Sequence, residues 1–338
     1  SKHYTIAAPG RLKEASSSIY GDLAWQYDVS GNLTHFQDTA YTYQFHQLKQ
    51  GGTSAIPAAI SAQYDASGNM KSLSLASENW QYSFDSRNRL LSASGPGTYQ
   101  FAYDHHGRRI AKSDPDGTTV LYITPFYEVV VSGADSTSTR YFHGPTGRFG
   151  ASTPGPDRSQ SPEIYGSGTV YAHLDHLGST QLTTDVDGQA SRTVYSPYGQ
   201  VRQRTSANNF RYGYGGKELD GTGLYYFAAR YFHPELGRFV SADNQPGGKA
   251  GQADIFNPYA YVLNDPVSYA DPSGHHFFKR VAHDVKHGST TAWHKVKQGS
   301  AKGWQGAKHG SVNAWHDTKH AVMSRTGELV ISSVINSL

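Results

Sequence analysis

Between residues 20 and 105 the chain alternates apolar and polar positions with a period of two. The apolar members, many of them aromatic, are Leu23, Trp25 and Tyr27; Ile60, Ala62 and Tyr64; Trp80, Tyr82 and Phe84; and Tyr99, Phe101 and Tyr103. Because successive side chains of a β-strand point to opposite faces of a sheet, this alternation gathers each set on one face. The pattern predicts β-strands with one buried face.

Each of these strands is followed by an aspartate and a turn. The pairs are Tyr27-Asp28, Tyr64-Asp65, Phe84-Asp85 and Tyr103-Asp104, with a degenerate copy at Phe45-His46, and their starts are spaced by 18 to 20 residues. The aspartate can accept hydrogen bonds from backbone N–H groups of the turn, and Gly or Asn at the tip tolerates left-handed backbone. We predict a row of hairpins, and this structural role is favoured over a catalytic or sugar-binding role for the pairs.

From about residue 120 to 210 the repeat loosens. Repeat-like turns return at residues 174–180 and 195–199, and residues 144–168 are rich in Gly, Pro and Ser, which is typical of an exposed loop. His173 and His176 flank Asp175, an arrangement that raises the question of a metal. Because they lie inside a repeat-like turn, we favour a structural role and predict no metal site and no cofactor.

Residues 215–274 form a junction between this β-rich part and a tail of different composition. An aromatic run at residues 225–232 and a turn at residues 234–237 predict a strand, a turn and a strand. Downstream, Asn257-Pro258, Asp265-Pro266 and Asp271-Pro272 each join an Asx residue to a proline, which bars helix. The second half of the junction is therefore predicted to be an extended chain with frequent turns.

The junction resembles the C-terminal end of the Rhs, or YD-repeat, core, which also occurs in the C component of insecticidal toxin complexes. The matching residues are Gly223-Leu224-Tyr225-Tyr226, Ala229-Arg230-Tyr231, Pro234, Gly237-Arg238-Phe239, Asp243, Asn257-Pro258-Tyr259-Ala260-Tyr261, Asn264, Pro266 and Asp271-Pro272-Ser273-Gly274. The resemblance implies a hollow β-shell that encloses a C-terminal payload. Since a full shell of that family uses many more repeats, we expect part of a shell or a reduced, open one.

The resemblance also implies self-cleavage. In that family two aspartates near the end of the core form an aspartic protease that cuts just after an Asp-Pro-x-Gly-Leu motif. The matching candidates are Asp243 and Asp271, with Asp254 as a third, and the cleavage site falls at Gly274 and His275. The chemistry requires two carboxylates that share a proton, one activating water while the other protonates the carbonyl.

Two departures from the family pattern weaken this expectation. Asn244 stands where the family usually has proline, and His275 stands where it usually has leucine. A structural reading remains beside the catalytic one, because Asp265 and Asp271 can form Asx-Pro turns and Asp243 can cap a strand end.

After Gly274 a second repeat, of eleven residues, is marked by Trp293, Trp304 and Trp315. Eleven residues make almost three helical turns, so the tryptophans line up on one stripe of a basic amphipathic helix. The tail carries nine Lys and Arg against three Asp and Glu, whereas the rest carries 21 against 24. Such a helix can pack inside or against the shell, lie on an anionic membrane surface, or contact nucleic acid.

Composition agrees with an all-β body, since 24 Tyr and 36 Gly among 338 residues suit twisted hairpins. The absence of cysteine excludes disulfides and thiolate zinc sites. There is no signal peptide at residues 1–12 and no apolar run of the length that spans a membrane. We therefore expect a fragment or processed product of a secreted or cell-surface bacterial protein.

The sequence thus predicts a mostly β protein: a curling antiparallel sheet of stacked YD-repeat hairpins at residues 1–214, a terminal plug at residues 215–274 and an α-helical tail at residues 275–338. Its predicted function is the shell of a polymorphic toxin that presents the tail as payload or its start. The predicted partners are its own tail, other shell or delivery components, a membrane surface, and an immunity protein if the tail is toxic. The alternative is a non-enzymatic adhesive or assembly scaffold anchored by the tail, and self-cleavage is the one enzymatic activity that the sequence predicts.

Overall fold

The structure is a computed structural model that describes residues 2–75, 78–144, 147–153, 168–206, 210–244, 257–275 and 278–279. All of these lie in the first of the two units of the chain, Ser1–Val281. The predicted helix with Trp293, Trp304 and Trp315 lies outside the described residues and stays a prediction, as do the predicted domain boundaries.

The first unit is built on a 20-stranded antiparallel sheet in which each strand pairs with the next one along the chain. The strands are β1 (Lys2–Ala7), β2 (Arg11–Ser17), β3 (Gly21–Tyr27), β4 (Leu33–Phe36), β5 (Thr39–Gln44), β6 (Gln47–Gly52), β7 (Ile60–Tyr64), β8 (Met70–Leu75), β9 (Glu78–Phe84), β10 (Leu90–Ser94), β11 (Thr98–Tyr103), β12 (Arg109–Ser113), β13 (Thr119–Thr124), β14 (Tyr127–Ser132), β15 (Asp135–Gly144), β16 (Gly147–Ser152), β17 (Thr169–Leu174), β18 (Thr180–Asp185), β19 (Ala190–Tyr195) and β20 (Val201–Arg204).

A smaller set of elements follows the sheet. It comprises the 3-10 helix η1 (Tyr214–Gly216), β21 (Glu218–Leu219), β22 (Tyr225–Tyr226), β23 (Tyr231–His233), β24 (Arg238–Phe239), the 3-10 helix η3 (Val262–Asn264), β25 (Tyr269–Ala270) and β26 (Phe278–Lys279). Strands β21 to β24 pair in order as a four-stranded sheet. We call residues 210–275, as far as they are described, the plug.

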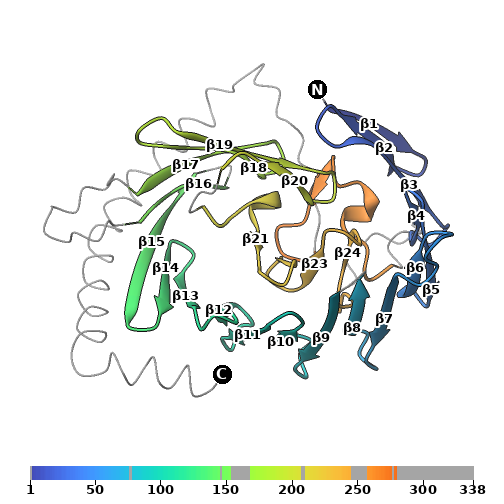
Figure 1. Ribbon diagram of the computed structural model, residues 1–338, viewed down its shortest axis with the longest axis horizontal. Helices are drawn as coiled ribbons and strands as arrows, with labels where there is room; N and C mark the ends of the chain where they lie inside the picture. The colour runs from blue at the N-terminus through green and yellow to red at the C-terminus, as the bar shows by residue number, and fades with distance from the viewer. Residues whose placement is uncertain are drawn as a thin grey trace, which may run out of the picture. The chain divides into compact units, whose positions relative to one another are not determined.

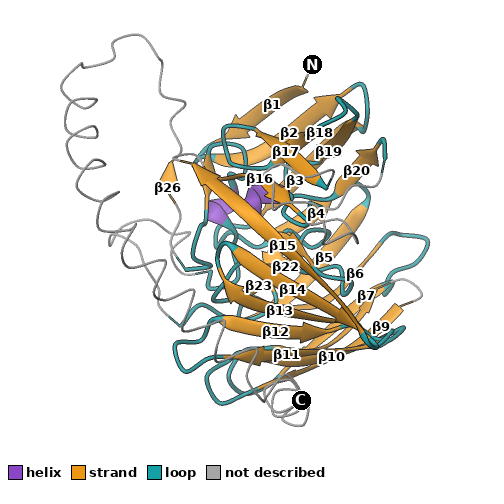
Figure 2. Cartoon of the chain, turned by 90° about the vertical axis from the view of Figure 1, so that its left-hand side faces the viewer, coloured by secondary structure: helices purple, strands orange, loops and turns teal. Residues whose placement is uncertain are grey.

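The strands of the large sheet follow one another round an arc, with the plug on its inner side (Figure 1). A view turned by 90° shows β10 to β15 lying side by side like a fan (Figure 2). No backbone pairing joins β1 to β20 in the described chain, although Lys2 Nζ of β1 donates to the carbonyl of Tyr195 at 3.2 Å. The predicted curling antiparallel sheet is confirmed, and it is open.

The repeated turn forms as predicted. Asp28 Oδ1 accepts the backbone N–H groups of Ser30 and Asn32, both at 2.9 Å, and Asp65 Oδ1 accepts those of Ser67 and Asn69 at 2.9 and 2.8 Å. The same pair of hydrogen bonds recurs at Asp85, Asp104, Asp175 and Asp185. The sheet register shifts beside the aromatic residue that precedes several of these turns, as in a β-bulge. The aspartate therefore closes a bulged hairpin.

One copy of the repeat starts at a different residue from the predicted one. Phe45 is 85% exposed at the tip of the β5–β6 hairpin, and Phe45 and His46 both have positive φ. Tyr43 pairs with Leu48 across a register shift, which is the place that Tyr27 takes opposite Leu33. Because this turn is shorter, the aromatic residue of the copy is Tyr43 and not Phe45.

We expect Asp65→Ala to destabilise the unit by about 1–3 kcal/mol, because it leaves two turn N–H groups and the Asn69 amide without their acceptor. Urea unfolding followed by tryptophan fluorescence measures the change. Asp38→Ala is the matched control, since Asp38 is an exposed aspartate outside the repeated turns. Equal midpoints for the two variants would contradict the role given to Asp65.

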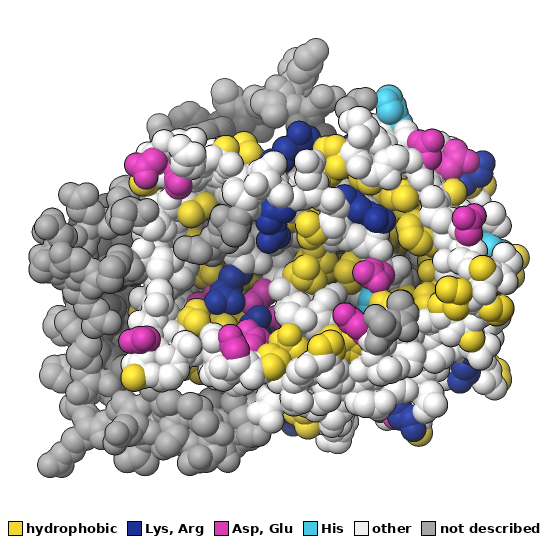
Figure 3. Space-filling model, in the orientation of Figure 1, with side chains coloured by type: hydrophobic (Ala, Val, Ile, Leu, Met, Phe, Trp, Pro, Cys, Tyr) yellow, Lys and Arg dark blue, Asp and Glu magenta, His cyan; other side chains and the backbone are white. Residues whose placement is uncertain are grey.

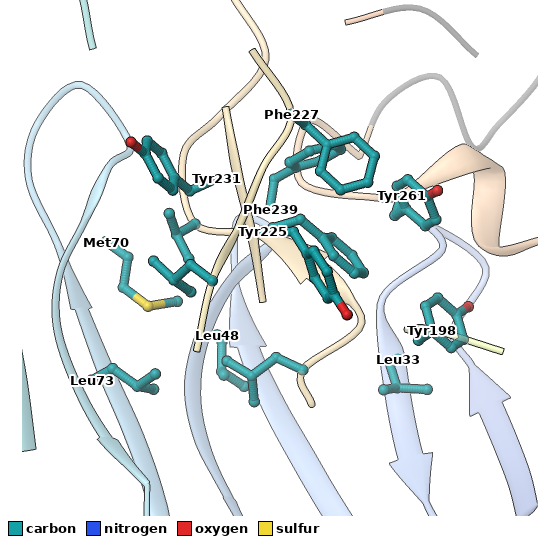
Figure 4. Packing of buried hydrophobic residues seen from close by; sticks show 14 of the residues in the cluster. Leu33, Leu48, Met70, Leu73, Tyr198, Tyr225, Phe227, Tyr231, Phe239 and Tyr261 are labelled. Atoms are coloured by element: carbon teal, nitrogen blue, oxygen red, sulfur yellow. The ribbon is translucent and has the colours of Figure 1, made fainter. Parts of the chain in front are cut away.

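The plug fills the curve of the sheet along β2 to β11. Leu33, Leu48, Met70 and Leu73 of the sheet face Tyr225, Phe227, Tyr231, Phe239 and Tyr261 of the plug (Figure 4). Inside the plug the aromatic rings meet edge-on or tilted, with Phe232 and Tyr261 centroids 4.6 Å apart. Along β2 to β11 the apolar inner face of the sheet is covered by plug residues. The hollow interior that the resemblance implies is therefore not found along these strands.

Polar groups of the plug also bind the tips of the repeat hairpins. Asn264 Nδ2 donates to the carbonyl of Gly31 at 2.9 Å, and the hydroxyl of Tyr259 donates to the carbonyl of Gly68 at 2.8 Å. A Cβ at position 68 would lie 2.9 Å from that hydroxyl, so the turn requires glycine there. Tyr259 of the Asn-Pro-Tyr segment and Asn264 of η3 therefore hold the ends of the hairpins.

Along β12 to β20 the inner side is more open. A cleft of about 530 Å³ lies between the sheet and β21, and its lining is rich in hydroxyl and charged groups, among them Thr137, Thr139, Thr153 and Arg211. Lys, Arg, Asp and Glu side chains gather around a hollow on the face shown in Figure 3. The unit thus has one filled half and one open, polar half.

A buried cluster of four charges joins the two halves. Arg109 contacts Glu218 at 2.7 Å and Asp220 at 2.5 Å, and Lys112 contacts the same two carboxylates at 2.9 Å each. All four side chains are at most 4% exposed, and the Arg109 guanidinium lies 4.2 Å from the ring centroid of Tyr226. Burial opposes ionisation of Glu218, but the two cations outweigh it and lower its pKa to about 2. This cluster fixes β21 to β12.

We expect Arg109→Met to destabilise the unit by about 3–5 kcal/mol, because it removes the buried cation that contacts both Glu218 and Asp220 at 2.7 Å or less. The neighbouring Arg108→Met is the control, since Arg108 is 73% exposed and its pair with Asp104 is screened by solvent. Urea unfolding of both variants makes the comparison. Similar shifts of the two midpoints would show that the buried cluster does not hold the plug.

Candidate functional site

The candidate residues lie where the plug ends. Asp243 follows β24, and its backbone N–H donates to the carbonyl of Pro258 at 2.9 Å. Asp271 follows β25 and leads directly to Gly274 and His275. The third candidate, Asp254, lies outside the described residues. Two of the three predicted aspartates can therefore be placed.

Arg230, in the turn between β22 and β23, brings these residues together. Its Nη2 lies 3.0 Å from Asp243 Oδ2 and 3.8 Å from Asp271 Oδ2, and its Nε donates to the carbonyl of Gly274. Its guanidinium carbon stands 3.7 Å from the centroid of the Phe239 ring. Burial lowers the pKa of Arg230 to about 10, against the opposing effect of the two aspartates. One buried cation thus contacts both carboxylates and the backbone at the predicted cleavage site.

Three successive carbonyl groups ahead of His275 are each bound by a donor of the plug. Lys217 Nζ donates to Pro272 O at 2.6 Å, the N–H of Ala229 donates to Ser273 O at 3.2 Å, and Arg230 donates to Gly274 O. This segment is therefore held along its backbone, much as a substrate peptide is held in a cleft.

Gly274 is fixed from both sides. Asp271 Oδ1 accepts the N–H groups of Gly274 at 2.8 Å and of Ser273 at 3.1 Å. Gly274 has a φ of +78°, and a Cβ there would lie 2.4 Å from the carbonyl oxygen of Phe227, so no other residue fits. Burial raises the pKa of Asp271, while Arg230 and the two turn N–H groups pull it down. Asp271 forms the predicted Asx turn and also faces the arginine.

His275 reaches back to the other aspartate. Its Nδ1 lies 2.8 Å from Asp243 Oδ1, and its backbone N–H donates to Ser273 Oγ at 3.2 Å. The imidazole borders an open cleft of about 470 Å³ that is also lined by Arg87, Arg89 and His106 from the repeat turns. The site is therefore reached by solvent on one side and closed by the plug on the other.

Motif matching found the two aspartates and the Gly274-His275 boundary but gave no role to Arg230. The sequence feature that could have indicated a role for Arg230 is its place within a run of aromatic residues, which the fold has to bury. A buried guanidinium needs carboxylate partners, and the sequence offers few within the plug. Of the two histidines weighed for a metal, His173 contacts Thr184 Oγ1 and His176 contacts the carbonyl of Val267. Within the described ranges no three metal-ligating side chains gather.

The sequence profile of the teneurin YD-shell family matches residues 1–267. The chain belongs to the teneurin YD-shell family. This confirms the resemblance to the YD-repeat core. The match covers the plug as far as residue 267, and Asp271, Gly274 and His275 lie beyond it.

Known proteins with similar sequence include toxins. Toxin subunit YenC1 of Yersinia entomophaga is 37% identical over 131 residues, which are 36% of this chain and 13% of that protein. The tRNA3(Ser)-specific nuclease WapA of Bacillus spizizenii is 30% identical over 231 residues, 64% of this chain and 9% of that protein. The crystal structure of TcdB2-TccC3 matches with a TM-score of 0.48 and 20% identity over 81% of this chain and 18% of that one. The YD-shell chain thus spans a minor part of each.

We expect Arg230→Gln to raise the pKa of Asp271 further, because burial already raises it and the variant removes the cation that opposes burial. Carbon NMR of Asp side chains during a pH titration measures the change. Arg211→Gln is the matched control, since Arg211 pairs with Glu128 and Glu218 and not with Asp271. An Asp271 titration that is the same in both variants would contradict the pairing.

Proposed function

We propose that this YD-shell chain is a shell segment of a bacterial polymorphic toxin that encloses and presents its C-terminal residues and cuts itself at the Gly274–His275 bond. This bond lies one residue ahead of the end of the family motif, in which His275 takes the leucine position, and it is chosen because Arg230 holds the carbonyl of Gly274. The observation that carries the proposal is the single buried guanidinium of Arg230, which contacts Asp243, Asp271 and the carbonyl oxygen of Gly274. The names of the toxin relatives support the toxin context.

The cleavage chemistry follows from these contacts. A water molecule adds its oxygen to the carbonyl carbon of Gly274 and gives a proton to Asp243. Arg230 stabilises the negative charge that develops on the carbonyl oxygen, as donors of an oxyanion hole do. Asp243 then passes that proton to the nitrogen of His275 as the C–N bond breaks, while Asp271 pairs with Arg230 and accepts the N–H groups of Ser273 and Gly274 that hold this segment in place. The products are a carboxyl group on Gly274 and an amino group on His275.

The open half of the shell supports the enclosing role. Its cleft of about 530 Å³ has a polar lining and lies beside a small apolar cluster of Tyr141, Ala151, Ala172 and Phe210. The payload in this proposal is residues 275–338, and the partners are other shell or delivery components of a secreted toxin, together with an immunity protein.

Mass spectrometry of the purified chain tests the cleavage. We expect the 36.9 kDa chain to yield a fragment that ends at Gly274, because the carbonyl held by Arg230 is that of Gly274. Asp243→Asn and Asp271→Asn should each abolish the cut. Asp265→Asn is the control, since Asp265 forms another Asx-Pro turn of the plug and an Asn keeps its bond to the N–H of Ser268. A wild-type chain that stays intact refutes self-cleavage.

Expression in a test bacterium tests the payload. Residues 275–338, produced in the cytoplasm and separately in the periplasm, should arrest growth in at least one compartment if they are toxic. The matched control is the same segment with Trp293, Trp304 and Trp315 replaced by Ser. Normal growth in both compartments would favour the scaffold alternative.

A further inference from the structure

The contact between His275 and Asp243 stands in the way of the proposed chemistry. Asp243 Oδ2 faces Arg230 at 3.0 Å and Oδ1 faces the imidazole Nδ1 of His275 at 2.8 Å. A carboxylate that activates water needs one oxygen within hydrogen-bond reach of that water. The oxygen that would serve is engaged by the side chain at the cleavage boundary itself.

The surroundings of His275 allow the imidazole to leave this contact. Its side chain is 19% exposed and borders the 470 Å³ cleft, so rotation about its own side-chain bonds carries it toward solvent. Its backbone, in contrast, is fixed by the bond from its N–H to Ser273 Oγ and by the clamped Gly274. The side chain can therefore move without moving the peptide bond that precedes it.

We propose that His275 is a positioning residue that restrains self-cleavage: its imidazole holds Asp243 and keeps the attacking water out until the side chain swings into the cleft. This inference rests on the self-cleavage proposed above. A residue at position 275 without a hydrogen-bonding side chain removes this imidazole contact from Asp243 Oδ1. With His275 in place, a side chain at the cleavage site itself slows the reaction, and the chain is cut slowly after folding.

The test compares the rate at which the purified full-length chain is cut, followed by the loss of the intact mass. His275→Leu should be cut about tenfold faster or more, because a hydrogen bond to a carboxylate is strong enough to shift an equilibrium by that factor. His275→Asn should stay close to the wild-type rate, since the amide Nδ2 of Asn can take the place of the imidazole Nδ1 beside Asp243. Asp243→Asn combined with His275→Leu should not be cut, like Asp243→Asn alone, which would show that the faster cutting still requires Asp243.

His173→Leu is the control for the loss of an imidazole, because His173 is exposed on the sheet and its ring contacts Thr184 Oγ1. Thermal unfolding of each variant checks that the plug remains folded. His275→Asn keeps the test open if His275→Leu disturbs folding, because cutting of His275→Asn well above the wild-type rate contradicts a restraint by the hydrogen bond.

Each outcome of these rate measurements supports or overturns the restraint by His275. Faster cutting of His275→Leu with near wild-type cutting of His275→Asn supports the restraint. Equal or slower cutting of His275→Leu, or equal acceleration in both variants, overturns the restraint and leaves self-cleavage standing. An absence of cutting in every variant overturns the self-cleavage proposal and the restraint with it.

Discussion

A β-sheet that curls has an inner face that its own strands cannot cover, and in this chain side chains from residues 214–240 and 261–262 cover it along β2 to β11. The aromatic side chains that each repeat places on that face would otherwise remain in water, at a cost of about 25 cal/mol for each Å² of apolar surface. The plug also binds the turn carbonyls of Gly31 and Gly68, so it fixes hairpin ends as well as hairpin faces. The shape of the sheet therefore depends on the plug.

The same burial determines the chemistry of the chain end. Arg230 lies in a turn of the plug, and its guanidinium cannot remain in an apolar surrounding without anions. Asp243 and Asp271 supply them, and the contact to Gly274 O follows because Asp271 begins the turn that contains Gly274. A site that joins two carboxylates, a cation and one backbone carbonyl thus arises from the need to satisfy one buried charge.

The two halves of the unit differ in how their inner faces are covered, and this difference concerns the function of the shell. Along β2 to β11 the inner face is apolar and covered, while along β12 to β20 it borders a polar cleft and the four-charge cluster of Arg109, Lys112, Glu218 and Asp220. Ion pairs in that cluster are directional, so they fix β21 against β12 in one position, which apolar packing alone does less strictly. Plug residues such as Arg211 and Glu218 line the cleft of the open half without filling it.

The sequence by itself determined the hairpins. The period of two, the aromatic residue and the Asp-x-x-Gly turn act within a few residues of each other, so local rules located the strands and the hydrogen bonds of Asp28 and Asp65. The same rules failed at Phe45, where a turn one residue shorter moved the repeat to Tyr43. Only the tertiary structure decided that the inner face is half filled, that Arg230 joins Asp243 to Asp271, and that His275 lies on Asp243. These contacts link residues far apart in the chain, and the physical reason for them, burial of charge among aromatic side chains, exists only after the sheet has curled round the plug.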